Sequence, residues 1–181
     1  MERMLVFIFS LCLISLQLRA QSETIVWQKG QKLNWSDFKG TPEGKIYEAA
    51  RSEFKVEFKY SGSSDNGELV FQFDVSALFI PKASWYVADK VSNELLMHEQ
   101  LHFDITELYA RKMRQRFQTA PISKENYKAD IKAIYGKVMD ELKAYRKQYN
   151  NDTLFGANLN KQLQWNSKVH KEMGDLEKFV K

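Results

Sequence analysis

The chain has 181 residues, a formal net charge of +4, one cysteine and three histidines. This length suits one domain of ordinary size. The basic residues are scattered and interleaved with acidic ones, which indicates a solvated surface and argues against nucleic acid as a partner.

The N-terminus has the features of a secretory signal peptide. Arg3 provides a positive start, residues 5–16 form a largely apolar run, and Ala20 offers a small residue for cleavage. The run is too short to span a bilayer comfortably, so we expect no membrane span after cleavage. We predict a signal peptide at residues 1–20 and a single domain at residues 21–181, exported to the periplasm or the extracellular space. The only cysteine lies in the apolar run, so the mature chain has no thiolate ligand and no disulfide.

The first part of the mature chain is predicted to form β-structure. Residues 21–40 predict a short strand and then a turn segment with aromatic anchors. Apolar residues alternate with polar ones over residues 54–60 and again over residues 69–75, as in half-buried strands. The intervening residues 61–67 predict a turn, with Asn66-Gly67 a strong hairpin signal. We therefore expect an antiparallel hairpin.

Three helices are predicted after the hairpin. The first covers about residues 89–117, the second runs from a Ser123 cap to about Tyr149, and the third covers about residues 159–179. Residues 150–153 are expected to separate the last two. Because the strands come first and the helices follow without alternation, the predicted class is α+β, with an antiparallel sheet packed on the first helix and two more helices after it.

The motif His-Glu-x-x-His lies in the first predicted helix. His98 and His102 are four residues apart, so they share one face, and the apolar stripe of that helix predicts that both point inward. A buried imidazole without a partner costs about 1–3 kcal/mol. A zinc ion is one such partner, and Glu99 is the residue that such sites use as a general base on water. The alternative is two hydrogen-bonded core histidines without an ion.

Catalytic zinc needs a third protein ligand. His170, the remaining histidine, lies at the edge of the apolar stripe of the third helix, where a half-exposed surface position is expected. The acidic side chains weighed as ligands are Asp152, Asp140, Glu141 and Glu107. Glu107 projects from the far face of the motif helix, and Asp104 also points away from the histidines, where a surface or outer hydrogen bond is expected for it. The third ligand stays open, with Asp152 and His170 as the candidates.

Four blocks of the sequence resemble a bacterial family, domain of unknown function 922, whose members are described as secreted zinc-dependent proteases of the zincin type. The blocks are residues 95–111 (LLMHEQLHFDITELYAR), 33–40 (LNWSDFKG), 49–52 (AARS) and 164–166 (QWN). The resemblance implies a zincin-like fold, a peptide or protein substrate and Zn²⁺ as the cofactor. It also implies His98 and His102 as ligands and Glu99 as the catalytic residue.

The chain departs from the family pattern at one place. The family usually has Thr-x-His-Gly after the second helix, and that histidine looks like the third ligand. Here the segment is Thr153-Leu154-Phe155-Gly156, and phenylalanine cannot bind zinc. Either a nearby acid such as Asp152 substitutes, or the site binds metal weakly, or the chain no longer does the chemistry.

The leading hypothesis is therefore an exported zinc metallopeptidase. Glu99 would take a proton from the attacking water and pass it to the leaving amine. The zincin resemblance implies that an extended substrate joins a sheet edge beside the motif helix. The alternative is a non-catalytic, zincin-like periplasmic binding or interaction domain with an incomplete metal site, which Phe155 favours. A third hypothesis is a structural envelope protein with core histidines.

Overall fold

The structure is a computed structural model that describes residues 24–42, 48–65 and 68–181. Its strands are β1 (Ile25–Val26), β2 (Ala50–Arg51), β3 (Phe54–Asp65), β4 (Glu68–Phe79) and β5 (Trp85–Tyr86). Its helices are α1 (Asn93–Thr119), α2 (Tyr127–Thr153) and α3 (Leu159–Asp175), with 3₁₀ turns at Trp35–Asp37, Pro81–Ala83 and Glu177–Phe179. Antiparallel strands followed by helices confirm the predicted α+β class.

The expected signal peptide at residues 1–20 lies outside the described residues. Among the described helices, none combines the length and the apolar character that crossing a membrane requires.

β3 and β4 form the long antiparallel hairpin that the alternating pattern predicts. Their register pairs Phe54 with Phe79 at the base. The prediction of a turn over residues 61–67 is wrong for residues 61–65, because these continue the ladder with β4 and so pair their backbone groups. Asn66-Gly67 lies outside the described residues. β1 adds to the free edge of β4, and β2 pairs with β5 in a separate two-stranded sheet.

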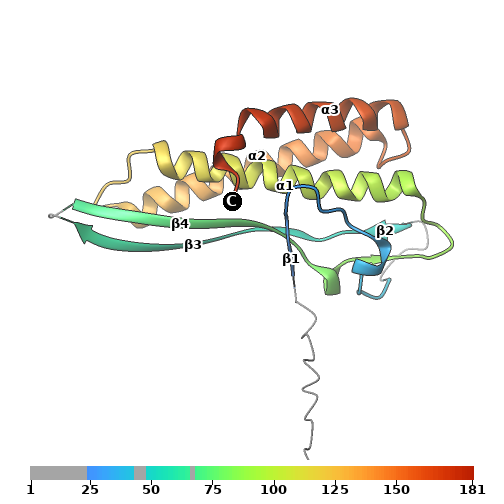
Figure 1. Cartoon of the computed structure of the whole chain (residues 1–181), viewed down its shortest axis with the longest axis horizontal. Helices are drawn as coiled ribbons and strands as arrows, with labels where there is room; N and C mark the ends of the chain where they lie inside the picture. Colours follow the sequence, from blue (N-terminus) through green and yellow to red (C-terminus); the bar gives the residue numbers. More distant parts are fainter. Residues whose placement is uncertain (1–23, 43–47, 66–67) are drawn as a thin grey trace, which may run out of the picture.

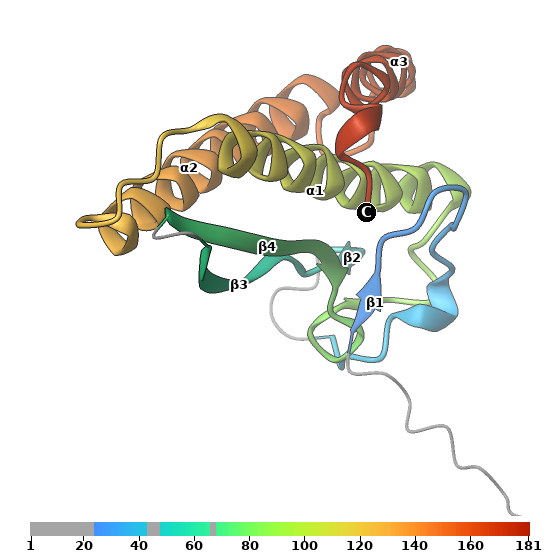
Figure 2. The same cartoon turned by 60° about the vertical axis from the view of Figure 1, so that its left-hand side comes forward.

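α1 is the central helix. It begins at Asn93, later than predicted, because the Ser92 side chain caps it by accepting a hydrogen bond from the Leu95 backbone N–H at 3.2 Å. α1 packs on β3 and β4 and also on α2 and α3. Figures 1 and 2 show the hairpin on one side of α1 and α3 on the opposite side. The face opposite the histidines is consequently buried as well, including Gln100, Asp104, Glu107 and Arg111.

α2 extends beyond its predicted end, to Thr153 rather than Tyr149. Its N-cap is Asn126 rather than Ser123. The predicted break over residues 150–153 is wrong, because these residues form the last helical turn, in which the Thr153 hydroxyl donates to the Tyr149 carbonyl at 2.7 Å. The helix ends where the next residue adopts a left-handed conformation. This extra turn brings further side chains from α2 to α1.

The apolar core lies between the hairpin and the helices. Phe73 of β4 stacks on Phe117 of α1 with ring centroids 4.0 Å apart, and Phe58 of β3 contacts Tyr135 of α2 at 5.1 Å. α1 and α2 therefore both pack on the hairpin.

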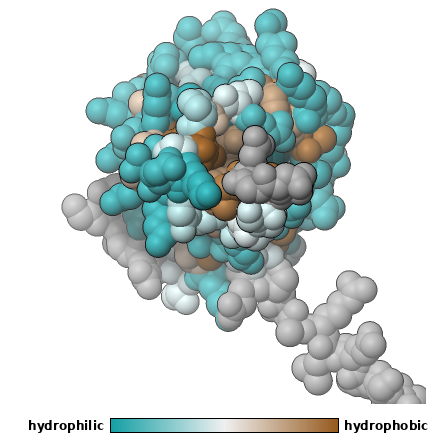
Figure 3. All heavy atoms as spheres, turned by 90° about the vertical axis from the view of Figure 1, so that its left-hand side faces the viewer, coloured by the Kyte–Doolittle hydropathy of each residue, from teal (hydrophilic) through white to brown (hydrophobic). Residues whose placement is uncertain are grey.

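A space-filling view towards the left-hand end of Figure 1 shows hydrophilic side chains around a smaller apolar area (Figure 3).

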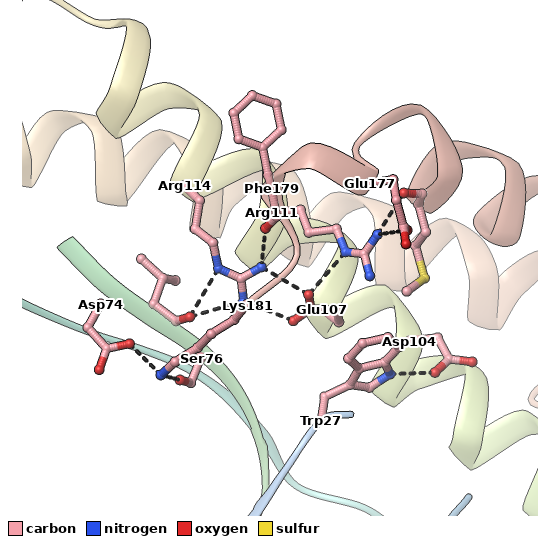
Figure 4. Close-up of polar contacts among 12 residues, drawn as sticks. Trp27, Asp74, Ser76, Asp104, Glu107, Arg111, Arg114, Glu177, Phe179 and Lys181 are labelled. Carbon is pink, nitrogen blue, oxygen red and sulfur yellow. Dashed lines mark hydrogen bonds and ion pairs between the residues drawn. The ribbon is translucent and has the colours of Figure 1, made fainter. Parts of the chain in front are cut away.

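A buried ion cluster holds the C-terminal segment on α1 (Figure 4). α3 ends at Asp175, short of the predicted Phe179. The Glu107 carboxylate accepts hydrogen bonds from Arg111 Nε at 3.0 Å and from Arg114 Nη1 at 3.0 Å. Arg114 also donates to the backbone carbonyl of Phe179 at 2.6 Å. Glu107, one of the acids weighed as a ligand, is therefore occupied by two guanidinium groups.

Candidate active site

The motif lies near the start of α1. This start is at the right-hand end of Figure 1, where β2, the end of α2 and the start of α3 also lie. His98 and Glu99 are 3% and 6% exposed, and His102 is partly buried. The centroids of the two imidazole rings are 4.9 Å apart, with their planes at 86°. One turn of helix thus brings two imidazoles together, as the four-residue spacing predicts.

His98 is oriented by a residue of α3. Its Nδ1 lies 3.1 Å from Gln162 Oε1, which also accepts the Tyr149 hydroxyl at 2.8 Å. The amide nitrogen of Gln162 donates to Asn166, so it is the oxygen that faces the imidazole. Nδ1 of His98 therefore donates, and Nε2 keeps its lone pair. Metal-binding histidines are held by the same kind of outer hydrogen bond.

The loop after α2 passes closely over His98. Gly156 has φ +88°, and a Cβ atom there would lie 3.0 Å from His98 Cβ. The two residues before it, Leu154 and Phe155, also have positive φ values, of 50° and 54°. This sharp turn leaves Phe155 69% exposed at the cavity edge. Phe155 can offer apolar contact there but no metal ligand.

His102 faces a residue that the sequence did not suggest. Its Nε2 lies 2.8 Å from Asn150 Oδ1 in the last turn of α2. Asn150 also favours the charged form of His98, so its amide acts on both imidazoles. Burial lowers the pKa of both histidines, and the nearby charges of His98 and Arg146 lower the pKa of His102 further. Both rings are therefore neutral near pH 7, the form that binds metals.

Glu99 points to a different partner from the histidines. Its carboxylate accepts a hydrogen bond from the Ser52 hydroxyl, just after β2. Burial raises the pKa of Glu99 to about 7, although the Ser52 hydrogen bond lowers it in part. A carboxyl group with this pKa exchanges its proton readily near neutral pH.

The three motif residues line a cavity of about 700 Å³. The residues around it come from β2 and its flanks, α1, α2 and the loop after α2: Glu48, Ala49, Ala50, Arg51, Ser52, Phe54, Leu95, His98, Glu99, His102, Arg146, Asn150 and Phe155. β2 pairs with β5 along one edge, and its residues border the cavity. The site therefore combines titratable side chains, space for a ligand and a short strand at its side.

The other acids and the third histidine lie away from this pair. Asp152 accepts a hydrogen bond from Trp165 Nε1 at 3.1 Å. His170 has a 61% exposed side chain and lies 4.0 Å from Asp104.

The remaining candidates also lie elsewhere. Glu141 pairs with Arg116 at 2.7 Å, Asp140 is exposed, and Glu107 lies in the ion cluster of Figure 4. Within residues 24–42, 48–65 and 68–181, no group of three His, Cys, Asp or Glu side chains could hold a metal ion. The described residues thus bring together two imidazoles, a side chain that zinc accepts as a ligand, and the amide oxygen of Asn150 in place of a third histidine or an acid.

Asp104 is buried rather than on the surface. Its carboxylate accepts the Trp27 indole N–H at 2.8 Å and the Gln100 amide at 3.0 Å (Figure 4 shows the first). It stabilises the packing of the N-terminal segment on α1.

Sequence reasoning missed Asn150, Gln162 and Arg146 as site residues. The helical spacing of Ile131, Val138, Leu142 and Tyr145 continues to Tyr149 and Thr153, and this signal would have extended α2 over Asn150. Gln162 could be found only from the packing of α3 on α1.

Comparison with known proteins finds one match. The profile of the family described as "Bacterial protein of unknown function (DUF922)" matches residues 79–156, which include the whole motif and Asn150. Among curated proteins and among solved structures, nothing similar is found. The match agrees with the resemblance seen in the sequence and assigns no activity.

Proposed function

We propose that this protein is a zinc-dependent peptidase. The observation that carries the proposal is the convergence of His98, Glu99 and His102 on one cavity of about 700 Å³ beside a short strand. His98 supports it further, because its Nδ1 hydrogen bond leaves Nε2 free to bind an ion. His98 and His102 would hold the zinc, which would replace the hydrogen that His102 Nε2 shares with Asn150 Oδ1, the nearest third oxygen.

A zinc ion bound there would supply a Lewis acid that lowers the pKa of a water molecule and polarises a peptide carbonyl. Glu99 then accepts a proton on its carboxylate from the attacking water and delivers it to the leaving amine. The Ser52 hydroxyl keeps that carboxylate oriented. Because burial raises the pKa of Glu99 to about 7, both directions of proton transfer are accessible near neutral pH.

The strand edge suggests how a substrate would bind. Ala49 and Ala50 border the cavity, and β2 uses its other edge to pair with β5. An extended peptide added along this edge would form backbone hydrogen bonds, while its side chains enter the cavity. We also propose that the protein acts after export, because residues 1–20 have the pattern of a signal peptide.

A second candidate function is peptide binding without hydrolysis. Asn150 favours it, because an amide oxygen is not among the usual zinc ligands. In this alternative the cavity and the strand edge serve as a receptor, and the histidine pair is satisfied by the hydrogen bonds to Gln162 and Asn150.

The test measures metal and cleavage together. Purified protein is dialysed against zinc, its metal content is determined by mass spectrometry, and cleavage of a mixture of unfolded peptides is followed. We expect one zinc per chain, and Glu99→Gln should keep the zinc but lose about 100-fold or more in cleavage rate. Glu125→Gln, an exposed matched control, should behave as wild type. If the protein holds no stoichiometric zinc and Glu99→Gln has no effect on cleavage, the peptidase proposal is refuted. Peptide binding without cleavage would favour the second candidate function.

A further inference from the structure

Arg146 is a cation of the cavity that the proposed chemistry does not use. It lies on α2 one turn before Asn150, so both side chains are on the face that borders the histidine pair. Arg146 Nη2 donates to the Thr106 hydroxyl, and its guanidinium lies 5.6 Å from the centre of the Phe54 ring. These contacts hold the side chain in place at the cavity wall.

No carboxylate of the described ranges forms an ion pair with Arg146, and its buried Nε has no hydrogen-bond partner there. Every other described arginine has such a carboxylate within 4.0 Å: Arg51 pairs with Glu48, Arg111 and Arg114 with Glu107, and Arg116 with Glu141. A partly buried guanidinium without a carboxylate is costly unless an anion is supplied from outside.

The other groups of the cavity do not compensate this charge. Glu48 and Arg51 neutralise each other at 2.8 Å. The carboxylate of Glu99 accepts a hydrogen bond from the Ser52 hydroxyl and forms no ion pair with Arg146. Burial lowers the pKa of Arg146 to about 10, although the charge of Glu53, which forms no ion pair with it, raises the pKa in part; Arg146 therefore remains protonated. Within the described part of the chain, the cavity wall therefore carries a positive charge that has no ion-pair partner next to the site.

We propose that Arg146 binds a carboxylate of the substrate, and specifically the C-terminal carboxylate of a peptide. A planar guanidinium matches a carboxylate in two parallel hydrogen bonds, and here the fork is already held by Thr106. Since Arg146 borders the same cavity as His98 and His102, a carboxylate bound there sets the last residues of a peptide beside the histidine pair. This inference rests on the proposed peptidase function and narrows it to cleavage near a free C-terminus.

The test compares three peptides by isothermal titration calorimetry on the zinc-loaded Glu99→Gln protein, which leaves the peptides intact. They are acetylated tetra-alanine with a C-terminal acid, the same peptide as an amide, and an amide that ends in glutamate. The acid should bind about tenfold or more tightly than the plain amide. Arg146→Gln should remove that difference, and Arg146→Lys should keep part of it. Arg116→Gln, a partly exposed control outside the cavity, should leave the preference unchanged.

The outcomes separate the claims. Equal binding of acid and amide, or no binding of either, overturns the inference. The glutamate amide and the acid could bind equally well, with both losing affinity in Arg146→Gln. That result would support carboxylate binding by Arg146 but would overturn the assignment of the carboxylate to the peptide C-terminus. If Arg146→Gln fails to fold, the folded Arg146→Lys protein decides instead. A preference for the acid over the amide as large as in the parent protein, with the amide itself also binding tightly, counts against the inference. Wild-type cleavage of acids and amides at equal rates refutes this inference alone, whereas a carboxylate preference without any cleavage refutes only the peptidase.

Discussion

Replacement of Glu107 by glutamine tests the ion cluster on α1 that holds the C-terminal segment. One carboxylate accepts hydrogen bonds from Arg111 Nε at 3.0 Å and from Arg114 Nη1 and Nη2 at 3.0 and 3.1 Å. Glu107 and Arg111 are 2% and 1% exposed. Glutamine has nearly the same shape but no charge, so the substitution leaves two guanidinium groups without their shared anion.

The size of the effect follows from what each arginine keeps. Removal of one partner of a buried ion pair costs about 3–5 kcal/mol. Arg111 retains the Met173 carbonyl at 2.8 Å and the Glu177 carboxylate at 3.1 Å, and Arg114 retains the carbonyls of Val75 at 3.0 Å and Phe179 at 2.6 Å. Because these acceptors remain, we expect a loss of about 3 kcal/mol, a large part of the 5–15 kcal/mol that stabilises a typical domain.

The assay is urea unfolding followed by tryptophan fluorescence at pH 7, with zinc affinity measured on the same samples. Glu141→Gln is the matched control, because its pair with Arg116 has side chains 36% and 31% exposed and should contribute at most about 1 kcal/mol. Zinc affinity should be the same in all three proteins. If Glu107→Gln unfolds at the wild-type urea concentration, or if it weakens zinc binding while stability is unchanged, the assignment of Glu107 to the ion cluster fails.

Three further predictions concern the site. Asn150→His should raise zinc affinity about tenfold or more by adding a third imidazole. Asn151→His, at the exposed neighbouring residue, should leave zinc affinity unchanged. Equal affinities of the two variants would mean that residue 150 does not lie where a third zinc ligand is needed. Gly156→Ala should lower the free energy of unfolding by about 1–2 kcal/mol, because φ is +88° and the new Cβ would contact His98. In the same urea titrations, the control Gly136→Ala in α2 should be neutral or stabilising. Similar effects of the two substitutions would contradict a strained turn at Gly156. In zinc-free protein, the free energy of unfolding of the wild type should fall by about 3 kcal/mol relative to Glu99→Gln as pH rises from about 4.5 to 7. The reason is that the carboxyl group of Glu99 keeps its proton in the folded state, where its pKa is about 7, but loses it in the unfolded state. Urea titrations at pH 5 and pH 8 that show no such difference would refute the burial argument.

The features set by short-range spacing could be predicted from the sequence. The alternating residues 54–60 and 69–75 form the hairpin, and the four-residue spacing of His98 and His102 brings their rings together. Both patterns arise from the geometry of one strand or one helical turn, in which hydrogen bonds and side-chain directions repeat at a constant period. The fold class followed for the same reason, since the order of strands and helices is local information.

The partners of those residues required the tertiary structure. Glu99 meets Ser52, His98 meets Gln162 and His102 meets Asn150, across 47, 64 and 48 positions of sequence.

Element ends were the weakest part of the sequence prediction, and the end of α2 matters most. Four polar residues, 150–153, were expected to stop the helix, but the side chain of Thr153 and the packing of Tyr149 under the histidines favour one more turn. That turn sets Asn150 against His102 and leaves Asp152 on Trp165.

The sequence by itself thus determined the two histidines, the glutamate and the strand-then-helix order. Only the packing of α2 and α3 on α1 decided that the amide of Asn150 faces His102 and that Arg146 lines the cavity without an ion-pair partner among the described residues. The physical reason is that a helix carries its own periodicity in its sequence, whereas its last residue and its neighbours depend on contacts between distant segments.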